Sequence, residues 1–283
     1  MPSAIQLHGE VLSCHAVGQF LLDPPVSYIN IFMKKALILG CSHACGAEMT
    51  DEPEIDLLNY HKDYYGYFMS YPAQLARLLG YHPVNHAISG GSNDAMFRIF
   101  ESFVNPYKDF KKPDIVIACW TGGERTEIWD FEEGEWIGLA GGKSNFTKVI
   151  PDKIILQGKT IGEPIDNRND VMAYQKQWIT HHADRWWGRM NKLKNILALN
   201  TMAAQEKIPV INIDSFGCVQ EYKFPDSVYC PVEQIEFSNW LVDQGFNNTK
   251  SGHYFLPAHK SFANFVYKKI NPKYHADVKQ ELT

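Results

Sequence analysis

Short apolar runs alternate along the chain with segments of helical period. The strand-like runs cover residues 36–39, 83–87, 114–120 and 208–214. Ala36 to Leu39 is apolar at every position, which is typical of a strand buried on both faces of a parallel sheet. Gly40 closes the first run, and Thr121-Gly122-Gly123 closes the third.

Helical patterns lie between and after these runs. They cover residues 71–79, 93–104, 172–205 and 257–269. Pro72 near the start of the first and Gly80 after its end mark its limits, and Ser92 or Asn93 is suited to cap the second. Strands that alternate with helices indicate a parallel sheet covered on both faces. We therefore predict a three-layer α/β/α sandwich with a flavodoxin-like sheet.

The first 32 residues and a central segment depart from this alternation. Residues 1–32 contain no Lys or Arg, so they lack the positive region of a secretory signal. They are either a peripheral extension or a product of start-site choice, and one domain is expected over residues 33–283. Residues from about 127 to 170, rich in Gly, Asp, Glu and Trp, predict an insertion that is partly β.

Composition excludes several classes of protein. The chain has 283 residues, of which 45% are hydrophobic, so it can bury a large core. Its formal net charge is −5 and it has no long basic run, which argues against a nucleic-acid partner. No window approaches the roughly 18 apolar residues of a membrane span, so no membrane partner is expected. The sequence does not specify an oligomeric state.

The six cysteines indicate a reducing compartment. They stand at positions 14, 41, 45, 119, 218 and 230. They are too few for a disulfide scaffold in a chain of this length, and several lie within apolar runs. We expect them to be mostly reduced and buried, which fits a cytoplasmic location.

Turns of small residues follow the first three strands, and a histidine-containing turn lies near the C-terminus. Ser42, Gly90 and Thr121 lie in the first three turns, and His253 lies in the last. In doubly wound sheets, ligands bind at the carboxyl ends of the strands. A hydroxyl, glycine N–H groups and an imidazole at that edge suit a nucleophile, oxyanion donors and a base.

The order and context of these turns resemble the SGNH (GDSL-like) hydrolase family over residues 33–270. Leu39 to Ser42 is similar to the block that carries the nucleophilic serine, with Cys41 in place of the usual Asp. The resemblance therefore implies the SGNH hydrolase fold, with Ser42 as the nucleophile. Asn85 to Ser92 is similar to the second block, which implies that the N–H of Gly90 contributes to the oxyanion hole.

The last block of the family carries the catalytic histidine ahead of a helix, six residues before a second histidine. His253 and His259 reproduce this spacing, so the resemblance implies that His253 is the base. The Asp usually found three residues before that histidine falls on Lys250. Three possibilities remain: His253 works in a dyad oriented by a backbone carbonyl, Asp243 reaches in, or catalysis has been lost.

The third block also departs from the family, because it contains no Asn after the third strand. It reads Trp120-Thr121-Gly122-Gly123-Glu124-Arg125, where the hydroxyl of Thr121 or a nearby backbone N–H would replace the Asn as an oxyanion donor. The segment from Trp120 to Trp129 resembles a variant associated with phage-encoded members. We regard Ser92-Asn93-Asp94, which superficially suggests the missing block, as a decoy because it follows the second strand.

The resemblance implies a serine esterase that hydrolyses small acyl esters, with O-acetyl groups on carbohydrate as one possible substrate. His253 would remove the proton of Ser42, and no metal or cofactor is expected. The alternative is a non-catalytic SGNH-fold module that binds glycans or associates with a virion, suggested by the two unmatched positions. A flavodoxin-like nucleotide-binding protein is disfavoured because no Gly-x-Gly-x-x-Gly or phosphate-binding Lys motif is present.

Each candidate residue also has a structural interpretation. Ser42 could simply cap a helix, Gly90 could belong to an ordinary tight turn and Thr121 could be purely structural. His253 could lie on a surface loop. These interpretations stand beside the catalytic one.

Further polar and aromatic groups have competing interpretations too. Cys41, His43 and Cys45 suit zinc, but no fourth ligand follows by spacing. The adjacent histidines 181 and 182 could also bind metal, although a helix would point them to different faces. Core packing or a contact with the insertion is favoured over a sugar platform for Trp186 and Trp187. Three charged residues after the third strand form either an ion-pair cluster beside the site or a surface network, namely Glu124, Arg125 and Glu127.

Overall fold

The computed structural model describes part of the chain, and the structural statements below refer to that part. It comprises residues 34–47, 49, 66–105, 110–130, 135–139, 155–156, 159–160, 185–216, 237–249 and 252–270. The chain divides into two compact units, Met1–Met33 and Lys34–Thr283, and every described residue belongs to the second.

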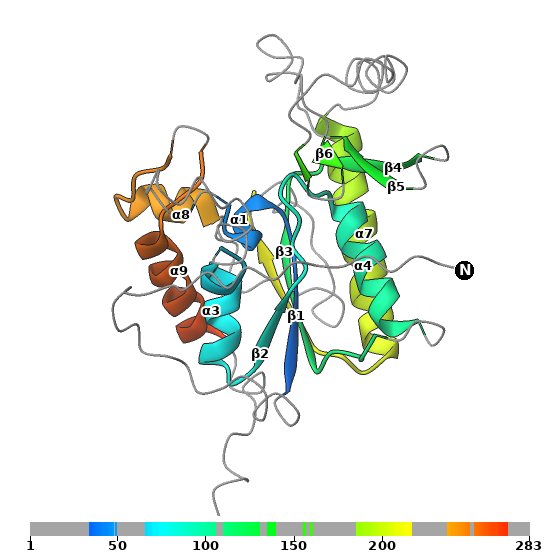
Figure 1. The fold of residues 1–283 in the computed structure, drawn as a ribbon, viewed down its shortest axis with the longest axis horizontal. Coiled ribbons are helices and arrows are strands. Elements are labelled where there is room, and N and C mark those ends of the chain that lie inside the picture. Colours follow the sequence, from blue (N-terminus) through cyan, green and yellow to red (C-terminus); the bar gives the residue numbers. More distant parts are fainter. Residues whose placement is uncertain are drawn as a thin grey trace, which may run out of the picture. The chain divides into compact units, whose positions relative to one another are not determined.

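A parallel sheet of four strands forms the centre of the second unit. The strands are β1 (Lys35–Leu39), β2 (His82–Asn85), β3 (Ile115–Trp120) and β8 (Val210–Asp214). Their order is β2-β1-β3-β8, and every neighbouring pair is parallel (Figure 1). The predicted parallel sheet is therefore confirmed, and all of its strands lie within or next to the predicted runs.

The central strands are buried on both faces. In β1, Ala36 and Ile38 belong to one hydrophobic core, whereas Leu37 and Leu39 belong to a second core on the opposite face. All four side chains are fully buried. Since successive side chains of a strand point to opposite faces, a strand between two cores has to be apolar at every position. This burial explains the continuous apolar run that predicted the strand.

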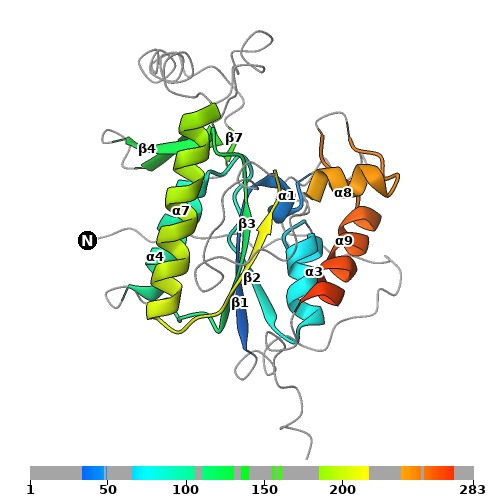
Figure 2. The same cartoon turned by 180° about the vertical axis from the view of Figure 1, so that it is seen from behind.

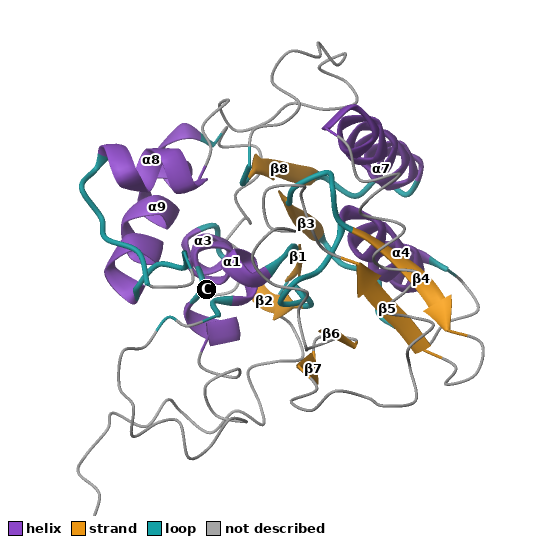
Figure 3. Ribbon diagram, turned by 90° about the horizontal axis from the view of Figure 1, so that it is seen from above, coloured by secondary structure: helices purple, strands orange, loops and turns teal. Residues whose placement is uncertain are grey.

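Helices cover both faces of the sheet, as Figures 2 and 3 show. One side carries α1 (Ser42–Cys45), α3 (Tyr71–Leu78), α8 (Phe237–Asp243) and α9 (Leu256–Lys269), and the other carries α4 (Asn93–Val104) and α7 (Arg185–Gln205). Helix α3 packs against α9, and α4 packs against α7. The predicted three-layer sandwich is confirmed. Helix α8 was not predicted, and residues 172–184 of the predicted long helix lie outside the described residues.

A second sheet follows β3. It consists of β4 (Thr126–Asp130), β5 (Glu135–Leu139), β6 (Ile155–Leu156) and β7 (Lys159–Thr160), paired antiparallel in that order. These strands fall in or beside the segment predicted to be a partly β insertion. Strand β4 is joined to α4 by a bidentate ion pair, in which Arg98 donates to both carboxylate oxygens of Glu127 at 2.7 and 2.9 Å.

A buried ion pair joins α7 to the end of β8. The Nζ of Lys192 lies 2.6 Å from a carboxylate oxygen of Asp214, and the two side chains are 0% and 7% exposed. The same oxygen accepts a hydrogen bond from the backbone N–H of Phe216 at 3.1 Å. Removing one partner of such a pair leaves an uncompensated buried charge. The pair therefore fixes the turn after β8 that carries Phe216.

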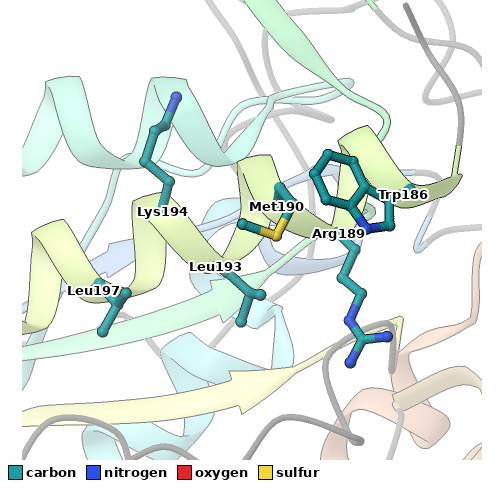
Figure 4. Close-up of a pocket in the computed structure, with 6 residues that line it drawn as sticks. All are labelled: Trp186, Arg189, Met190, Leu193, Lys194 and Leu197. Carbon is teal, nitrogen blue, oxygen red and sulfur yellow. The ribbon is translucent and has the colours of Figure 1, made fainter.

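The outer face of α7 exposes apolar side chains. Trp186 is 71% exposed and Met190 is 45% exposed, and both line a shallow pocket on this helix together with Arg189 and Leu193 (Figure 4). Core packing of Trp186, one of the two interpretations favoured from the sequence, is therefore wrong; most of the insertion that the other interpretation involves lies outside the described residues. The sequence motif shows two adjacent tryptophans, but adjacent helical residues point in different directions, and Trp187 alone is partly buried.

The three cysteines within the described residues are buried, namely Cys41, Cys45 and Cys119. This confirms the prediction for these three, and the other cysteines lie outside the described residues. Among the described helices, none is both long and apolar enough to span a bilayer.

Candidate active site

Ser42 is the first residue of α1 and follows β1 directly. The helix is capped by Cys41, whose side chain makes no capping hydrogen bond, so Ser42 does not serve as the N-cap. Ser42 is 7% exposed, and its carbonyl accepts hydrogen bonds from the backbone of Ala47 and the thiol of Cys45. The structure thus places the predicted nucleophile at the carboxyl edge of the sheet, at the start of a helix, where backbone N–H groups have no helical acceptor.

The Gly90 turn lies directly against the end of β1. The backbone N–H of Ile88 donates to the carbonyl of Gly40 at 3.0 Å, and that of Gly91 donates back to Ile88 at 2.8 Å. Gly90 has a φ of 74°, a left-handed conformation that favours glycine. A Cβ on Gly91 would lie 2.8 Å from the carbonyl oxygen of Ile88. The turn is a tight one, and it brings Gly90 beside the loop that leads to Ser42.

Asn85, the last residue of β2, holds this turn and α1 together. Its side-chain nitrogen donates to the carbonyls of Ala44 at 3.1 Å and Tyr67 at 3.0 Å. Its side-chain oxygen accepts from the backbone N–H of Ala87 at 3.0 Å. One side chain therefore links the loops that follow β1 and β2, which explains why an amide is suited to this position.

Thr121 follows β3 and is held by an asparagine from α4. The side-chain oxygen of Asn93 accepts from the backbone N–H of Thr121 at 3.0 Å, and its nitrogen lies 3.3 Å from the carbonyls of both Thr121 and Gly122. Thr121 is fully buried, and its hydroxyl has no hydrogen-bond partner. The sequence reasoning missed this role of Asn93, which it set aside as part of a decoy.

Helix α7 fixes the other side of the same turn. A Cβ on Gly123 would collide with the carbonyl oxygen of Gly188, and a Cβ on Gly188 would lie 2.9 Å from the backbone nitrogen of Glu124. The two backbones are thus in direct contact, and only glycine permits this approach. The turn that contains Thr121 is therefore held between α4 and α7.

His253 reaches α1 from a short loop before α9. Its backbone N–H donates to the hydroxyl of Thr249 at 3.1 Å, and its carbonyl accepts from the backbone N–H of Thr249 at 2.7 Å. The side chain is partly buried. The ring centroid of His253 lies 5.0 Å from that of His43, the residue that follows Ser42. The fold therefore brings the predicted base to the helix that carries the predicted nucleophile.

His43 is enclosed by aromatic rings and is neutral. Its ring lies 5.4 Å from that of Phe216 and 5.3 Å from that of Phe237, and its Nδ1 has no hydrogen-bond partner. Burial lowers the pKa of His43 to about 3, with the nearby His253, His259 and Arg125 acting in the same direction. Sequence reasoning considered His43 only as a metal ligand and missed its contact with His253.

His259 has a structural role on α9. Its Nδ1 accepts a hydrogen bond from the backbone N–H of Tyr71 at 3.1 Å, which joins α9 to the first residue of α3. Burial lowers the pKa of His259 to about 3. The second histidine of the spacing thus anchors α9, the helix that follows the His253 loop, to the start of α3.

Other candidates are exposed or lie outside the described residues. Asp243, proposed to orient His253, is exposed at the end of α8, whereas Lys250 and histidines 181 and 182 are outside the described residues. Within the described part of the chain, no group of three or more His, Cys, Asp or Glu side chains is arranged to hold a metal ion.

No family model and no curated protein sequence matches the chain. Among solved structures, similar ones include an acetyl xylan esterase from the rumen bacterium Butyrivibrio proteoclasticus, with a TM-score of 0.42, 10% identity and coverage of 87% of this chain and 65% of that one. A lipolytic-type protein of the G-D-S-L family from Desulfitobacterium hafniense has a TM-score of 0.32 and 12% identity over 84% of this chain and 99% of that one.

A family two carbohydrate esterase from Cellvibrio japonicus gives a TM-score of 0.33 and 10% identity, covering 84% of this chain and 62% of that one. The chain thus spans less than two thirds of the length of the two carbohydrate-directed esterases. The α/β sandwich expected from the resemblance to SGNH hydrolases is confirmed by the parallel sheet and flanking helices of the chain itself.

Proposed function

We propose that the chain is a serine ester hydrolase of the SGNH type that cleaves small acyl esters, with O-acetyl groups on carbohydrate as the substrate class to test. The observation that carries the proposal is the contact between α1 and the His253 loop. Ser42 begins α1, and the ring of the next residue, His43, lies 5.0 Å from that of His253. A hydroxyl and an imidazole from distant parts of the chain thus share one edge of the sheet.

In the proposed reaction, the imidazole of His253 accepts the proton of the Ser42 hydroxyl while the oxygen attacks the ester carbonyl carbon. The bond to the alcohol then breaks, and the alcohol leaves with the proton from His253. Water attacks the acyl-serine, again giving a proton to His253, and the carboxylic acid is released as Ser42 regains its hydrogen. Every proton is accounted for without a cofactor.

The negative charge of the tetrahedral intermediate needs donors that are already in place. The proposed donors are the backbone N–H groups of Ser42 and Gly90 and the hydroxyl of Thr121. Support comes from the turns that carry them: the Gly90 turn is hydrogen-bonded to the end of β1, and Asn93 anchors Thr121. The buried Thr121 hydroxyl is not used by any other group.

The proposal is tested by p-nitrophenyl acetate hydrolysis with the wild type, Ser42→Ala and His253→Gln. Each variant is expected to lower kcat about a thousandfold or more, because the residual rate comes only from binding and oxyanion stabilisation. Ser102→Ala on α4 and His82→Gln at the amino end of β2 are matched controls, and both should stay within about twofold of the wild type, since mutations away from the reacting atoms leave transition-state stabilisation intact.

A covalent serine reagent gives an independent readout. Diisopropyl fluorophosphate should add mass to the peptide that contains Ser42 in the wild type and to no peptide in Ser42→Ala. A wild type that hydrolyses the ester no faster than both site variants, and that resists the reagent, would exclude the esterase. A non-catalytic glycan-binding module would then become the leading interpretation.

A further inference from the structure

Arg125 has a buried guanidinium nitrogen with no partner. Its Nη1 makes no hydrogen bond, although the residue as a whole is only partly buried. A buried donor without an acceptor is unfavourable, and a charged donor more so. The described residues supply no acceptor for this nitrogen, so an acceptor on a ligand would compensate it.

Arg125 lies beside the candidate active site. Its guanidinium carbon stands 5.8 Å from the ring centroid of Phe216, over the face of the ring. Phe216 in turn lies 5.4 Å from His43, whose ring contacts His253. The positive charge of Arg125 also helps to lower the pKa of His43. Burial has the largest effect, followed by His253 and His259.

Two nearby carboxylates, those of Glu127 and Asp214, are paired with other cations. The sequence suggested an ion-pair cluster of Glu124, Arg125 and Glu127, but Glu127 pairs with Arg98 instead. The carboxylate of Asp214 is paired with a buried lysine. The carboxylate of Glu124 lies where a Cβ on Gly122 would meet it. Within the described part of the chain, no ion pair joins Arg125 to any of these groups.

The backbone of Arg125 is held in place. Its carbonyl accepts a hydrogen bond from the side chain of Asn191 on α7 at 3.3 Å. The preceding turn is pressed against α7 at Gly123 and Gly188. With a fixed backbone and a phenyl ring beneath it, the guanidinium loses little freedom when it binds a ligand.

We propose that Arg125 binds a carboxylate of the substrate, so that the chain acts on acyl esters of acidic sugars. This inference rests on the proposed esterase activity and names its substrate class. A guanidinium presents parallel N–H donors that match the two oxygens of a carboxylate, and such charge-assisted pairs are about twice as strong as neutral hydrogen bonds. The alcohol part of the ester would carry the anion, with its acetyl group directed to Ser42.

The test compares two acetylated sugars that differ only in the carboxylate, O-acetylated methyl glucuronoside and O-acetylated methyl glucoside. Acetate release is measured for the wild type, Arg125→Gln and Arg77→Gln. Arg77 lies in the last turn of α3, which leads to the opposite edge of the sheet, so it controls for the loss of one positive charge. Arg125→Gln should lower kcat/KM for the acidic sugar about ten- to a hundredfold and change the neutral sugar less than about threefold.

Direct binding separates the two proposals. Calorimetry with free glucuronate, which carries no ester, should show binding to the wild type and to Arg77→Gln, and a loss of at least about tenfold in Arg125→Gln. If glucuronate binds through Arg125 but no acetylated sugar is cleaved, carboxylate binding by Arg125 is supported and the proposed esterase activity is contradicted. Equal effects of Arg125→Gln on both sugars, or glucuronate binding that survives the substitution, would overturn the anion site and leave the esterase intact.

Discussion

The ring of His43 rests against the ring of His253, with their centroids 5.0 Å apart and their planes inclined by 54°. His43 is buried and its pKa is lowered to about 3, so it stays uncharged near neutral pH. A neutral ring fixes the position of a neighbouring imidazole without repelling the positive charge that the neighbour would acquire as a base. This contact joins the nucleophile helix to the base loop in the proposed site.

The two buried histidines make stability depend on pH. His43 and His259 have pKa values of about 3 in the folded chain, against 6.5 as the ordinary value. Below pH 6.5 the unfolded chain binds protons that the folded chain does not, so the free energy of unfolding falls as the pH falls towards 3. The expected loss is about 1.4 kcal/mol per pH unit for each imidazole.

Urea unfolding between pH 7.5 and 4.5 measures this dependence. His43→Phe keeps an aromatic ring in the enclosure but removes one imidazole. It should reduce the slope of the free energy of unfolding against pH by about 1.4 kcal/mol per pH unit. His82→Phe is the control, because His82 is partly exposed and its pKa is lowered less. A slope in His43→Phe that matches the wild type would show that His43 is not a buried neutral group.

Removing the buried hydroxyl of Thr121 tests whether this residue has a catalytic or a structural role. Thr121→Val keeps the shape of the side chain and removes an oxygen that has no partner. Stability should therefore be unchanged or rise by about 1 kcal/mol, whereas kcat should fall about a hundredfold or more if the hydroxyl holds the oxyanion. Thr121→Ser, which keeps the hydroxyl, should retain most of the activity. Full activity in Thr121→Val would remove Thr121 from the proposed oxyanion hole.

Asn93 should matter for both stability and activity. Asn93→Ala removes contacts to the backbones of Thr121 and Gly122 and leaves these buried groups unpaired. We expect a loss of about 2–4 kcal/mol in the free energy of unfolding, and a lower kcat because the Thr121 turn loses its anchor. Asn105→Ala at the end of the same helix removes a part-buried side-chain hydrogen bond to Glu101 and should cost less than about 1 kcal/mol.

Thermal or urea unfolding and ester hydrolysis, measured on the same preparations, separate the two effects of Asn93. A stable Asn93→Ala protein with reduced kcat would still support an anchoring role. Unchanged stability together with unchanged activity would contradict it.

The periodicity of the sequence predicted the sheet and most of its helices, because burial on both faces leaves a local signature. Ala36 to Leu39 is apolar throughout, and α4 begins where Ser92 supplies the cap, accepting a hydrogen bond from the backbone of Ala95. Helix α8, by contrast, was missed. It spans only Phe237–Asp243, and two helical turns are too short for a 3.6-residue period to be recognised.

The candidate site was only partly predictable. Resemblance indicated Ser42 and His253, and the order of the strands implied that they would share one edge of the sheet. The pairing of polar side chains did not follow from spacing: Glu127 is close in sequence to Arg125 but pairs with Arg98 on α4. The choice of ion-pair partners depends on how the helices pack against the sheet, and the pattern of apolar positions does not specify that packing.

The sequence by itself determined which segments are strands and helices, since each of these carries its own pattern of apolar positions. Only the tertiary structure decided that Asn93 anchors the Thr121 turn, that His43 lies against His253, and that Arg125 keeps a donor without a partner. These relationships join residues far apart in the chain. Their energies come from contacts and burial that exist only once the layers have packed, so no local pattern could show them.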